Sequence, residues 1–145
     1  MECAQVNRHA ERRIRDGGCN PPGGRAIDPT GAALEDRVAA LLARQGYRVE
    51  RTGGRQDGGV DLIAEKRDAA GTRLRLYVQC KDTDRPAGVE VARSLNGVLP
   101  PGDRGVTGVV VCPAGFTPEA RAFAAARQMQ LWDATRLERL ERGAA

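Results

Sequence analysis

The first periodic part of the chain carries apolar residues at helical spacing, namely Leu34, Val38, Leu41 and Leu42. Residues three, four and seven positions apart lie on one side of an α-helix, so this spacing predicts a helix with one buried face. Asp28 or Thr30 precedes the pattern as a candidate N-cap, and Gly46 follows it. We therefore expect a first helix that begins after Thr30 and ends before Gly46.

Shorter apolar segments follow, and their pattern is that of strands bounded by turns. Strands are predicted over residues 47–51, 60–66, 72–81, 106–112 and 129–132. Residues 68–71, which join the second strand to the third, form a polar connection of the length that hairpins use. The run over 106–112 is continuously apolar, which is typical of a strand that is buried on both faces.

Three further helices are expected between and after these strands. In the second helix, Val91, Leu95 and Val98 mark one face, and a pair of prolines at 100–101 ends it. Thr117 and Pro118 begin the third as cap and first-turn proline, and residues 134–141 form the last. The order α-β-β-β-α-β-α-β-α predicts an α/β fold with a central mixed β-sheet flanked by helices.

The chain of 145 residues is long enough for one hydrophobic core. Residues 1–29 contain paired glycines and prolines and no sustained apolar period, so we expect a flexible N-terminal extension before a single domain at 30–145. No apolar run approaches the roughly 20 residues of a membrane helix, and the N-terminus lacks the apolar centre of a secretory signal. The expected location is therefore cytoplasmic, without a membrane partner.

Composition narrows the possible partners and excludes some kinds of site. A net charge of +4 and a pI near 9.2 favour a polyanion. The four cysteines form no CxxC pair, which argues against a zinc site. Aromatic residues make up only 3% of the chain, so a platform that stacks single-stranded bases is not expected.

Candidate chemistry gathers on the predicted hairpin of residues 60–81. Alternate residues of a strand share a face, so Gln79 and Lys81 are expected to point one way, and Val78 and Cys80 the other. Asp61 stands on the preceding strand. If the register is right, a carboxylate, an amide and an ammonium meet on one face of the hairpin.

The flanks of Asp61 and the first helix complete this picture. Val60 and Leu62 are apolar, so the carboxylate of Asp61 is expected on the face opposite both. At 100° per residue, Glu35 lies beside the apolar stripe of the first helix and can reach the sheet, whereas Asp36 faces water. Hydrolysis of a phosphodiester needs oxygen ligands for Mg²⁺, a cation near the attacking water and neutralisation of the charge on phosphorus. These residues can supply all three.

Four motifs resemble the Mrr-type restriction endonuclease domain: Gly31-x-x-Leu34-Glu35-x-x-Val38, Gly46-Tyr47-x-Val49, Asp57-Gly58-Gly59-Val60-Asp61-Leu62-Ile63-Ala64 and Val78-Gln79-Cys80-Lys81. The resemblance covers roughly residues 30–140. It implies the three-layer restriction-endonuclease-like fold and cleavage of double-stranded DNA with Mg²⁺ or Mn²⁺. It also implies that Asp61 is a metal ligand, Lys81 the catalytic lysine and Glu35 the helical acid.

Gln79 departs from the wider superfamily, because it stands where other members carry a carboxylate. A neutral amide oxygen gives the site less negative charge to hold the metal. Glu35, the backbone carbonyl of Cys80 and the phosphates of DNA could offset that loss. Cys80 itself is expected to be a buried apolar residue rather than a nucleophile, since the single histidine, His9, lies in the N-terminal extension.

The sequence leaves several questions of function open. Arginines that flank the site and could hold DNA phosphates are Arg51, Arg55, Arg85 and Arg93. By family analogy the expected role is restriction of foreign or modified DNA. A catalytically silent DNA-binding module, a junction-resolving or repair nuclease and a plain structural domain are the alternatives. Cutting of both strands by one small domain would suggest a homodimer or two encounters.

Overall fold

The computed structural model describes residues 32–52 and 59–143 as a central sheet with helices on both sides. Its elements are α2 (Ala32–Arg44), β1 (Arg48–Arg51), β2 (Leu62–Arg67), β3 (Arg73–Cys80), α3 (Val89–Val98), β4 (Val106–Val111), α4 (Pro118–Ala126), β5 (Gln130–Trp132) and α5 (Ala134–Glu141). This order confirms the predicted one. The predicted extension at 1–29 lies outside the described residues.

The five strands form one mixed sheet in the order β1-β2-β3-β4-β5. The pairings of β1 with β2 and of β2 with β3 are antiparallel, whereas β4 lies parallel to both β3 and β5. Parallel neighbours need a crossover connection, and α3 and α4 provide one for each pair. In the part of the chain that the structure describes, no helix combines the length and apolarity needed to cross a membrane.

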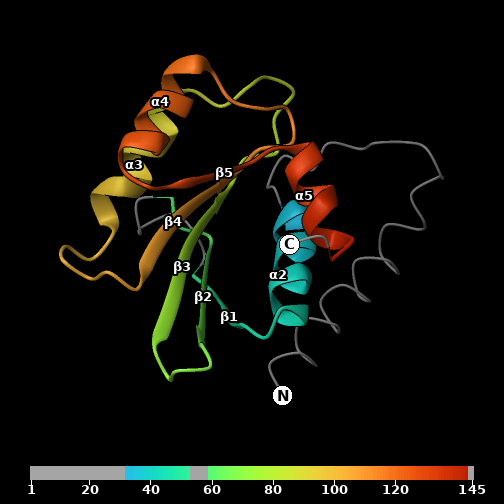
Figure 1. Cartoon of the computed structure of the whole chain (residues 1–145). Coiled ribbons are helices and arrows are strands. Elements are labelled where there is room, and N and C mark those ends of the chain that lie inside the picture. Colours follow the sequence, from blue (N-terminus) through green and yellow to red (C-terminus); the bar gives the residue numbers. More distant parts are fainter. Residues whose placement is uncertain (1–31, 53–58, 144–145) are drawn as a thin grey trace.

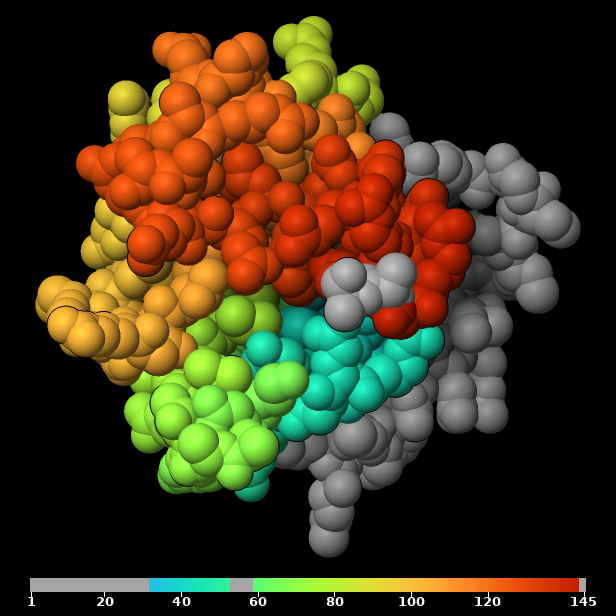
Figure 2. Space-filling view, viewed as in Figure 1, coloured from blue at the N-terminus to red at the C-terminus, as the bar shows by residue number. Residues whose placement is uncertain are grey.

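The sheet separates two helical layers (Figure 1). Side chains of α2 and of α5 pack with those of β2 and β3 in one apolar cluster. Side chains of α3 and α4 pack in a second cluster on the other face, together with Val110 and Cys112. In the space-filling view α5 lies directly beside α2, in red and cyan (Figure 2). The protein therefore has three layers, as predicted.

Helix α2 confirms the predicted apolar stripe, because its buried residues include Leu34, Val38, Leu41 and Leu42. The helix ends in a glycine motif. Gly46 adopts a φ of +94°, a left-handed value that suits glycine, and its N–H donates to Ala43 O. Tyr47 N–H donates to Leu42 O, which completes a Schellman-type C-terminus.

The predicted buried face of α3 is wrong in one position. Ala92 and Leu95 are buried, while Val98 is 38% exposed. Leu99, just beyond the helix, packs against the core instead. The spacing of Ala92, Leu95 and Leu99 is also helical, so the true face is rotated by about one residue. Periodicity alone did not distinguish the two stripes because alanine gives a weak apolar signal.

Side-chain caps set the starts of the last two helices. Thr117 Oγ1 accepts from Ala120 N at 3.2 Å, with Pro118 at the first helical position. Asp133 Oδ1 accepts from Arg136 N at 2.9 Å. The predicted Thr117 cap and the predicted bounds of the last helix are both confirmed.

Candidate active site

The backbone forms a β-bulge at Asp61, directly before β2 begins. Asp61 N–H donates to Val78 O at 2.8 Å, whereas the register makes Leu62 the partner of Val78. Two consecutive residues of one strand thus meet a single residue of the other, which is the pattern of a bulge. The alternation of faces resets there: Val60 packs in the cluster of α3 and α4, and Leu62 packs in the cluster of α2.

The bulge changes where the carboxylate of Asp61 points. The expectation that Val60 and Leu62 share one face, with Asp61 opposite both, is wrong, because a bulge shifts the alternation by one residue. Asp61 Oδ2 instead accepts from the backbone N–H of Cys80 at 2.8 Å. That N–H lies between Gln79 and Lys81 in the chain. The bulge therefore fixes Asp61 at the end of β3, beside both predicted partners.

The electrostatic environment of Asp61 links it to Lys81. Burial raises the pKa of the half-buried Asp61 carboxyl, while the hydrogen bond from Cys80 N–H and the positive charge of Lys81 lower it. Removal from water is the largest of these effects. A carboxylate that is partly removed from water, and whose charge is only partly balanced, favours the binding of a further cation.

Gln79 contributes an oxygen that lacks a partner. The side chain is 8% exposed, and within the described residues its buried Oε1 forms no hydrogen bond. Such an acceptor is costly unless something binds it. The amide lies over Gly59, where an added Cβ would stand 2.7 Å from Nε2. Gly59 also has a φ of +89°, so this glycine is required both by the backbone and by the space that Gln79 takes.

These donors fit a divalent metal ion that prefers oxygen. Asp61 offers a carboxylate, Gln79 an unpartnered amide oxygen and Cys80 a neighbouring backbone carbonyl. Across residues 32–52 and 59–143, no cluster of three or more His, Cys, Asp or Glu could hold a metal. A metal here would therefore depend on amide, carbonyl and substrate oxygens as well as on carboxylates, as the departure at Gln79 suggests.

Glu35 reaches the sheet, as predicted, and it meets a cation there. Arg51 of β1 forms ion pairs with Glu35 Oε1 at 3.6 Å and with Asp36 Oδ1. The expectation that Asp36 faces water is wrong, since its side chain is only 22% exposed and Arg51 holds it. Burial, then the charges of Asp61 and Glu35, raise the pKa of the Cys80 thiol.

The four predicted catalytic residues do not share one face of the sheet. Cys80 packs on the α2 side, where Glu35 acts on it, and strand alternation turns Gln79 and Lys81 toward the other side. Asp61 stands at the bulge, where its carboxylate accepts from Cys80 N–H and the charge of Lys81 lowers its pKa. The site therefore surrounds the end of β3 rather than lining one surface.

The predicted DNA-binding arginines lie in different settings. The guanidinium of Arg51 forms ion pairs with Glu35 and Asp36 of α2. Arg55 lies outside the described residues. Arg85 is exposed in the segment after β3. Arg93 is exposed on α3, with its guanidinium carbon 5.9 Å from the ring centre of Phe123. The same ring carries Arg127 at 4.0 Å, and since these two residues are four positions apart, helical spacing alone indicates their pairing.

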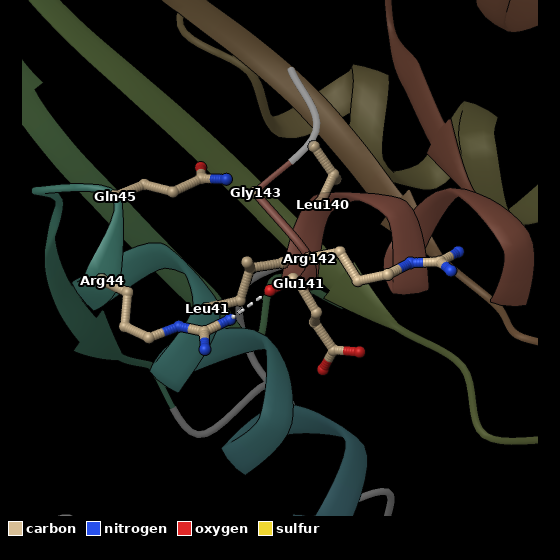
Figure 3. Close-up of a pocket in the computed structure, with 7 residues that line it drawn as sticks. All are labelled: Leu41, Arg44, Gln45, Leu140, Glu141, Arg142 and Gly143. Carbon is tan, nitrogen blue, oxygen red and sulfur yellow. Dashed lines mark hydrogen bonds between the residues drawn. The ribbon is translucent and has the colours of Figure 1, made fainter.

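A cavity of about 400 Å³ lies at the far end of α2 (Figure 3). Leu41, Arg44 and Gln45 line it from the end of α2, and residues 140–143 line it from the end of α5. The Arg44 side chain points toward the end of α5, and its guanidinium donates to Glu141 O at 3.2 Å. Glu35 is nine residues before Arg44, or about 13 Å along the helix, so the cavity takes no part in the candidate site.

Fold and site together define a restriction-endonuclease-like protein. A model of the restriction endonuclease family matches residues 28–140. The chain belongs to this family, and the resemblance seen in its motifs is thereby confirmed.

Individual relatives agree with this membership. The chain is 34% identical over 109 residues to the type IV methyl-directed restriction enzyme EcoKMrr of Escherichia coli, covering 71% of this chain and 35% of that enzyme. It is 29% identical over 89 residues to an uncharacterized mitochondrial protein of Schizosaccharomyces pombe, covering 60% and 36% respectively. The chain thus spans about a third of the length of these two relatives.

A solved structure supports the fold. The complex of EndoMS with double-stranded DNA matches with a TM-score of 0.54 at 17% identity, over 79% of this chain and 48% of that one. At this level of identity the likeness concerns the arrangement of the sheet and its helices. It agrees with the three layers described above.

Proposed function

We propose that this chain is a divalent-metal-dependent endonuclease that hydrolyses phosphodiester bonds of double-stranded DNA. The observation that carries the proposal is the hydrogen bond from Cys80 N–H to Asp61 Oδ2, at 2.8 Å. It holds a half-buried carboxylate between Gln79 and Lys81. Family membership and the structural likeness to a DNA-bound nuclease support the same reading.

In this proposal the metal-binding oxygens come from Asp61, Gln79 Oε1, the Cys80 carbonyl and Glu35. When bound, Mg²⁺ or Mn²⁺ supplies charge that polarises the phosphate and stabilises the leaving oxygen. Asp61 is preorganised by its backbone hydrogen bond, so it need not reorient when the cation binds. Gln79 Oε1 gains the partner it lacks, which offsets the cost of its burial.

Lys81 brings the positive charge of the protein itself. Its backbone N–H donates to Val111 O at 2.7 Å, which ties the residue to the parallel strand β4. The ammonium lies close enough to Asp61 to lower the pKa of that carboxyl. From there it would hold the attacking water or balance charge on phosphorus as the bond breaks.

The biological setting is proposed from the relatives. The E. coli relative is a methyl-directed restriction enzyme, so we propose restriction of foreign or modified DNA for this chain too. Action in the cytoplasm and a homodimer for double-strand cutting also belong to this proposal. So does a nuclease domain at 30–145 preceded by an extension.

Cleavage of plasmid DNA tests the central point. With Mg²⁺ or Mn²⁺ the full chain should convert supercoiled DNA to nicked or linear forms, and a chelator should stop it. If methylated and unmethylated plasmids both stay intact while the protein binds DNA at low salt, the silent DNA-binding module is correct instead. A preference for four-way junctions over linear duplexes would favour the repair nuclease.

A further inference from the structure

The antiparallel half of the sheet has an outward face toward the tip of its hairpin. Helix α2 packs against β1 and β2 on one side of the sheet, whereas α3 and α4 on the other side pack against β4 and β5. The tip of the hairpin formed by β2 and β3 extends beyond both α3 and α4 (Figure 1). Side chains that β1, β2 and β3 turn away from α2 are therefore open to solvent near that tip.

Arginines dominate this face. Ile63 and Tyr77 pack on the side of α3, and strand alternation places every second residue of their strands on the same side. The charged side chains that β1, β2 and β3 turn to this side are Arg48, Glu50, Glu65, Arg67, Arg73 and Arg75. These six residues, which we call the arginine face, carry a formal net charge of +2.

Two of the arginines stand directly opposite each other. Arg67 is the register partner of Arg73, and like charges in this arrangement repel. Glu65 lies 3.9 Å from Arg73 and 3.8 Å from Arg75, so one carboxylate serves two guanidiniums. Arg67 donates to the carbonyl of Gly71 at 3.0 Å and pairs with no carboxylate of the described residues. Contacts within the fold therefore leave much of this repulsion unbalanced.

The next row of the sheet continues the positive charge. Arg48 and Arg75 flank Glu65 as its register partners on β1 and β3. Arg48 is exposed and forms no ion pair within the part of the chain that the structure describes. Arg75 donates to Tyr77 OH at 3.0 Å, and it shares Glu65 with a second arginine. Neither Arg48 nor Arg75 has a carboxylate to itself.

The arginine face continues into the candidate site. Arg73, Arg75, Tyr77 and Gln79 alternate along β3, so they lie on one side of the sheet. At about 3.3 Å per residue, Arg75 and Arg73 lie roughly 13 and 20 Å from Gln79 along the strand. Phosphates of one DNA strand repeat about every 3.4 Å along the helix axis. A duplex that extends from the site along β3 would thus place phosphates about four to six base pairs away beside these arginines.

We propose that the arginine face binds the phosphate backbone of double-stranded DNA beside the site that cuts it. The inference rests on the proposed action on DNA and adds a substrate-binding surface to it. A guanidinium can donate two parallel N–H bonds to a phosphate, which makes phosphate a suitable partner for each arginine. A bound phosphate also relieves the repulsion between Arg67 and Arg73, because it brings negative charge to both.

The salt dependence of DNA binding tests this surface without relying on cleavage. The full chain is mixed with a fluorescein-labelled duplex and a chelator, and fluorescence anisotropy gives the affinity over a range of NaCl concentrations. Each phosphate contact contributes about 0.9 to the slope of log affinity against log salt. Arg67→Gln/Arg73→Gln should therefore reduce the slope by about 1.8, and Arg48→Gln by about 0.9.

Lys66→Gln is the matched control, because Lys66 lies on the same hairpin and faces α2. Its ammonium lies 4.5 Å from the ring centre of Tyr47 and donates to Gln45 O at 3.3 Å. Its loss should leave the slope unchanged. Thermal unfolding checks the fold of each variant, and the double variant should melt no lower than wild type because it removes a repulsion. If the double variant does not fold, Arg48→Gln decides the test, since it alters an exposed side chain.

The outcomes separate this inference from the nuclease proposal. An unchanged slope in the folded arginine variants, an equal reduction in Lys66→Gln, or no binding of the duplex by wild type would overturn the arginine face as a DNA contact. Cleavage of plasmid DNA together with unchanged slopes would leave the nuclease proposal standing alone. Reduced slopes in the arginine variants only would support the DNA contact even if plasmid DNA were never cut, and the nuclease proposal would then fail by itself.

Discussion

Helix α2 makes two arginine–carboxylate contacts, one with α5 and one with β1, and the two differ in a way that marks function. Arg37 and Glu141 join α2 to α5 through two short hydrogen bonds, so each charge has a full partner. Near Glu35, the Arg51 guanidinium contacts two carboxylates, and its buried Nε has no hydrogen-bond partner among residues 32–52 and 59–143. The first contact pairs one cation with one carboxylate, whereas the second shares one cation between two carboxylates.

The carboxyl groups of the two regions show the same contrast. The hydrogen bond from Arg37 lowers the pKa of Glu141, so the folded state favours its charged form. Burial raises the pKa of Asp61, so the folded state resists its charge. A group that the fold keeps charged at a cost is a candidate for chemistry, since structural stability alone would not maintain it.

Asp61→Asn should have the largest effect on activity. Removing the metal-binding charge should lower metal-dependent cleavage about a thousandfold, with DNA binding at low salt nearly unchanged. The pKa of Asp61 is raised in the folded state, so the protein loses stability as the pH rises and this carboxyl ionises. Asparagine cannot ionise, and the variant should therefore have a higher melting temperature at neutral pH. Plasmid cleavage and thermal unfolding measure the two effects, and a variant as active as wild type would remove Asp61 from the site.

Lys81→Met should follow, with a loss of at least about a hundredfold in turnover. The substitution keeps much of the aliphatic stem and the backbone hydrogen bond to Val111, so folding should survive. Single-turnover cleavage at saturating Mg²⁺ provides the measurement. Undiminished turnover would refute the catalytic assignment of the ammonium.

Gln79→Glu should keep the protein active and lower the Mg²⁺ concentration that cleavage requires. The added carboxylate places charge where the unpartnered Oε1 now lies, so half-maximal cleavage should need roughly tenfold less Mg²⁺. Gln79→Met is the matched variant without an oxygen ligand, and it should need more Mg²⁺. An inactive but folded Gln79→Glu would show that the neutral amide has a role that a carboxylate cannot fill.

Arg37→Met tests the other member of the comparison. Loss of this partly exposed pair should cost about 0.5 to 1 kcal/mol and leave cleavage unchanged. The pKa of Glu141 is lowered in the folded state, so the pair stabilises the fold fully at pH values above the ordinary pKa of a carboxyl group. The stabilisation is lost as the pH falls and Glu141 becomes protonated. Urea unfolding at neutral and acidic pH should therefore show a smaller difference from wild type in acid. A loss of cleavage would mean that the two regions are coupled.

Deletion of residues 1–28 should have the smallest effect. That stretch lacks a periodic apolar face and none of the proposed site residues lies in it. The shortened chain should unfold cooperatively and cut plasmid DNA at a rate close to that of the full chain. Loss of cooperative unfolding would show that the extension belongs to the fold.

The sequence predicted the elements well where local patterns decide them. The stripe of α2, the Thr117 cap and the order of strands follow from spacing and capping chemistry, and all were confirmed. The predicted hairpin also brought Asp61 to the same end as Gln79 and Lys81, where the Asp61 carboxylate accepts from Cys80 N–H. These features depend on residues close together in the chain.

The parts that were missed depend on contacts between distant residues. The bulge left no signature in the apolar pattern of the sequence, because Val60 and Leu62 flank Asp61 as they would in a regular strand, although they pack on opposite faces. Gly59, with a φ of +89°, was a signal that the backbone departs from a regular strand there. Arg51 meets Glu35 only after β1 folds back along α2, so periodicity placed Asp36 in water and left its partner undiscovered.

The most direct test of the account is a crystal structure of the full chain grown with Mn²⁺ and a short DNA duplex. An anomalous difference map then locates the metal independently of activity. We predict a peak bound by the Asp61 carboxylate, Gln79 Oε1, the Cys80 carbonyl and Glu35. A metal bound elsewhere, or Gln79 Oε1 turned away from it, would contradict the site proposed here.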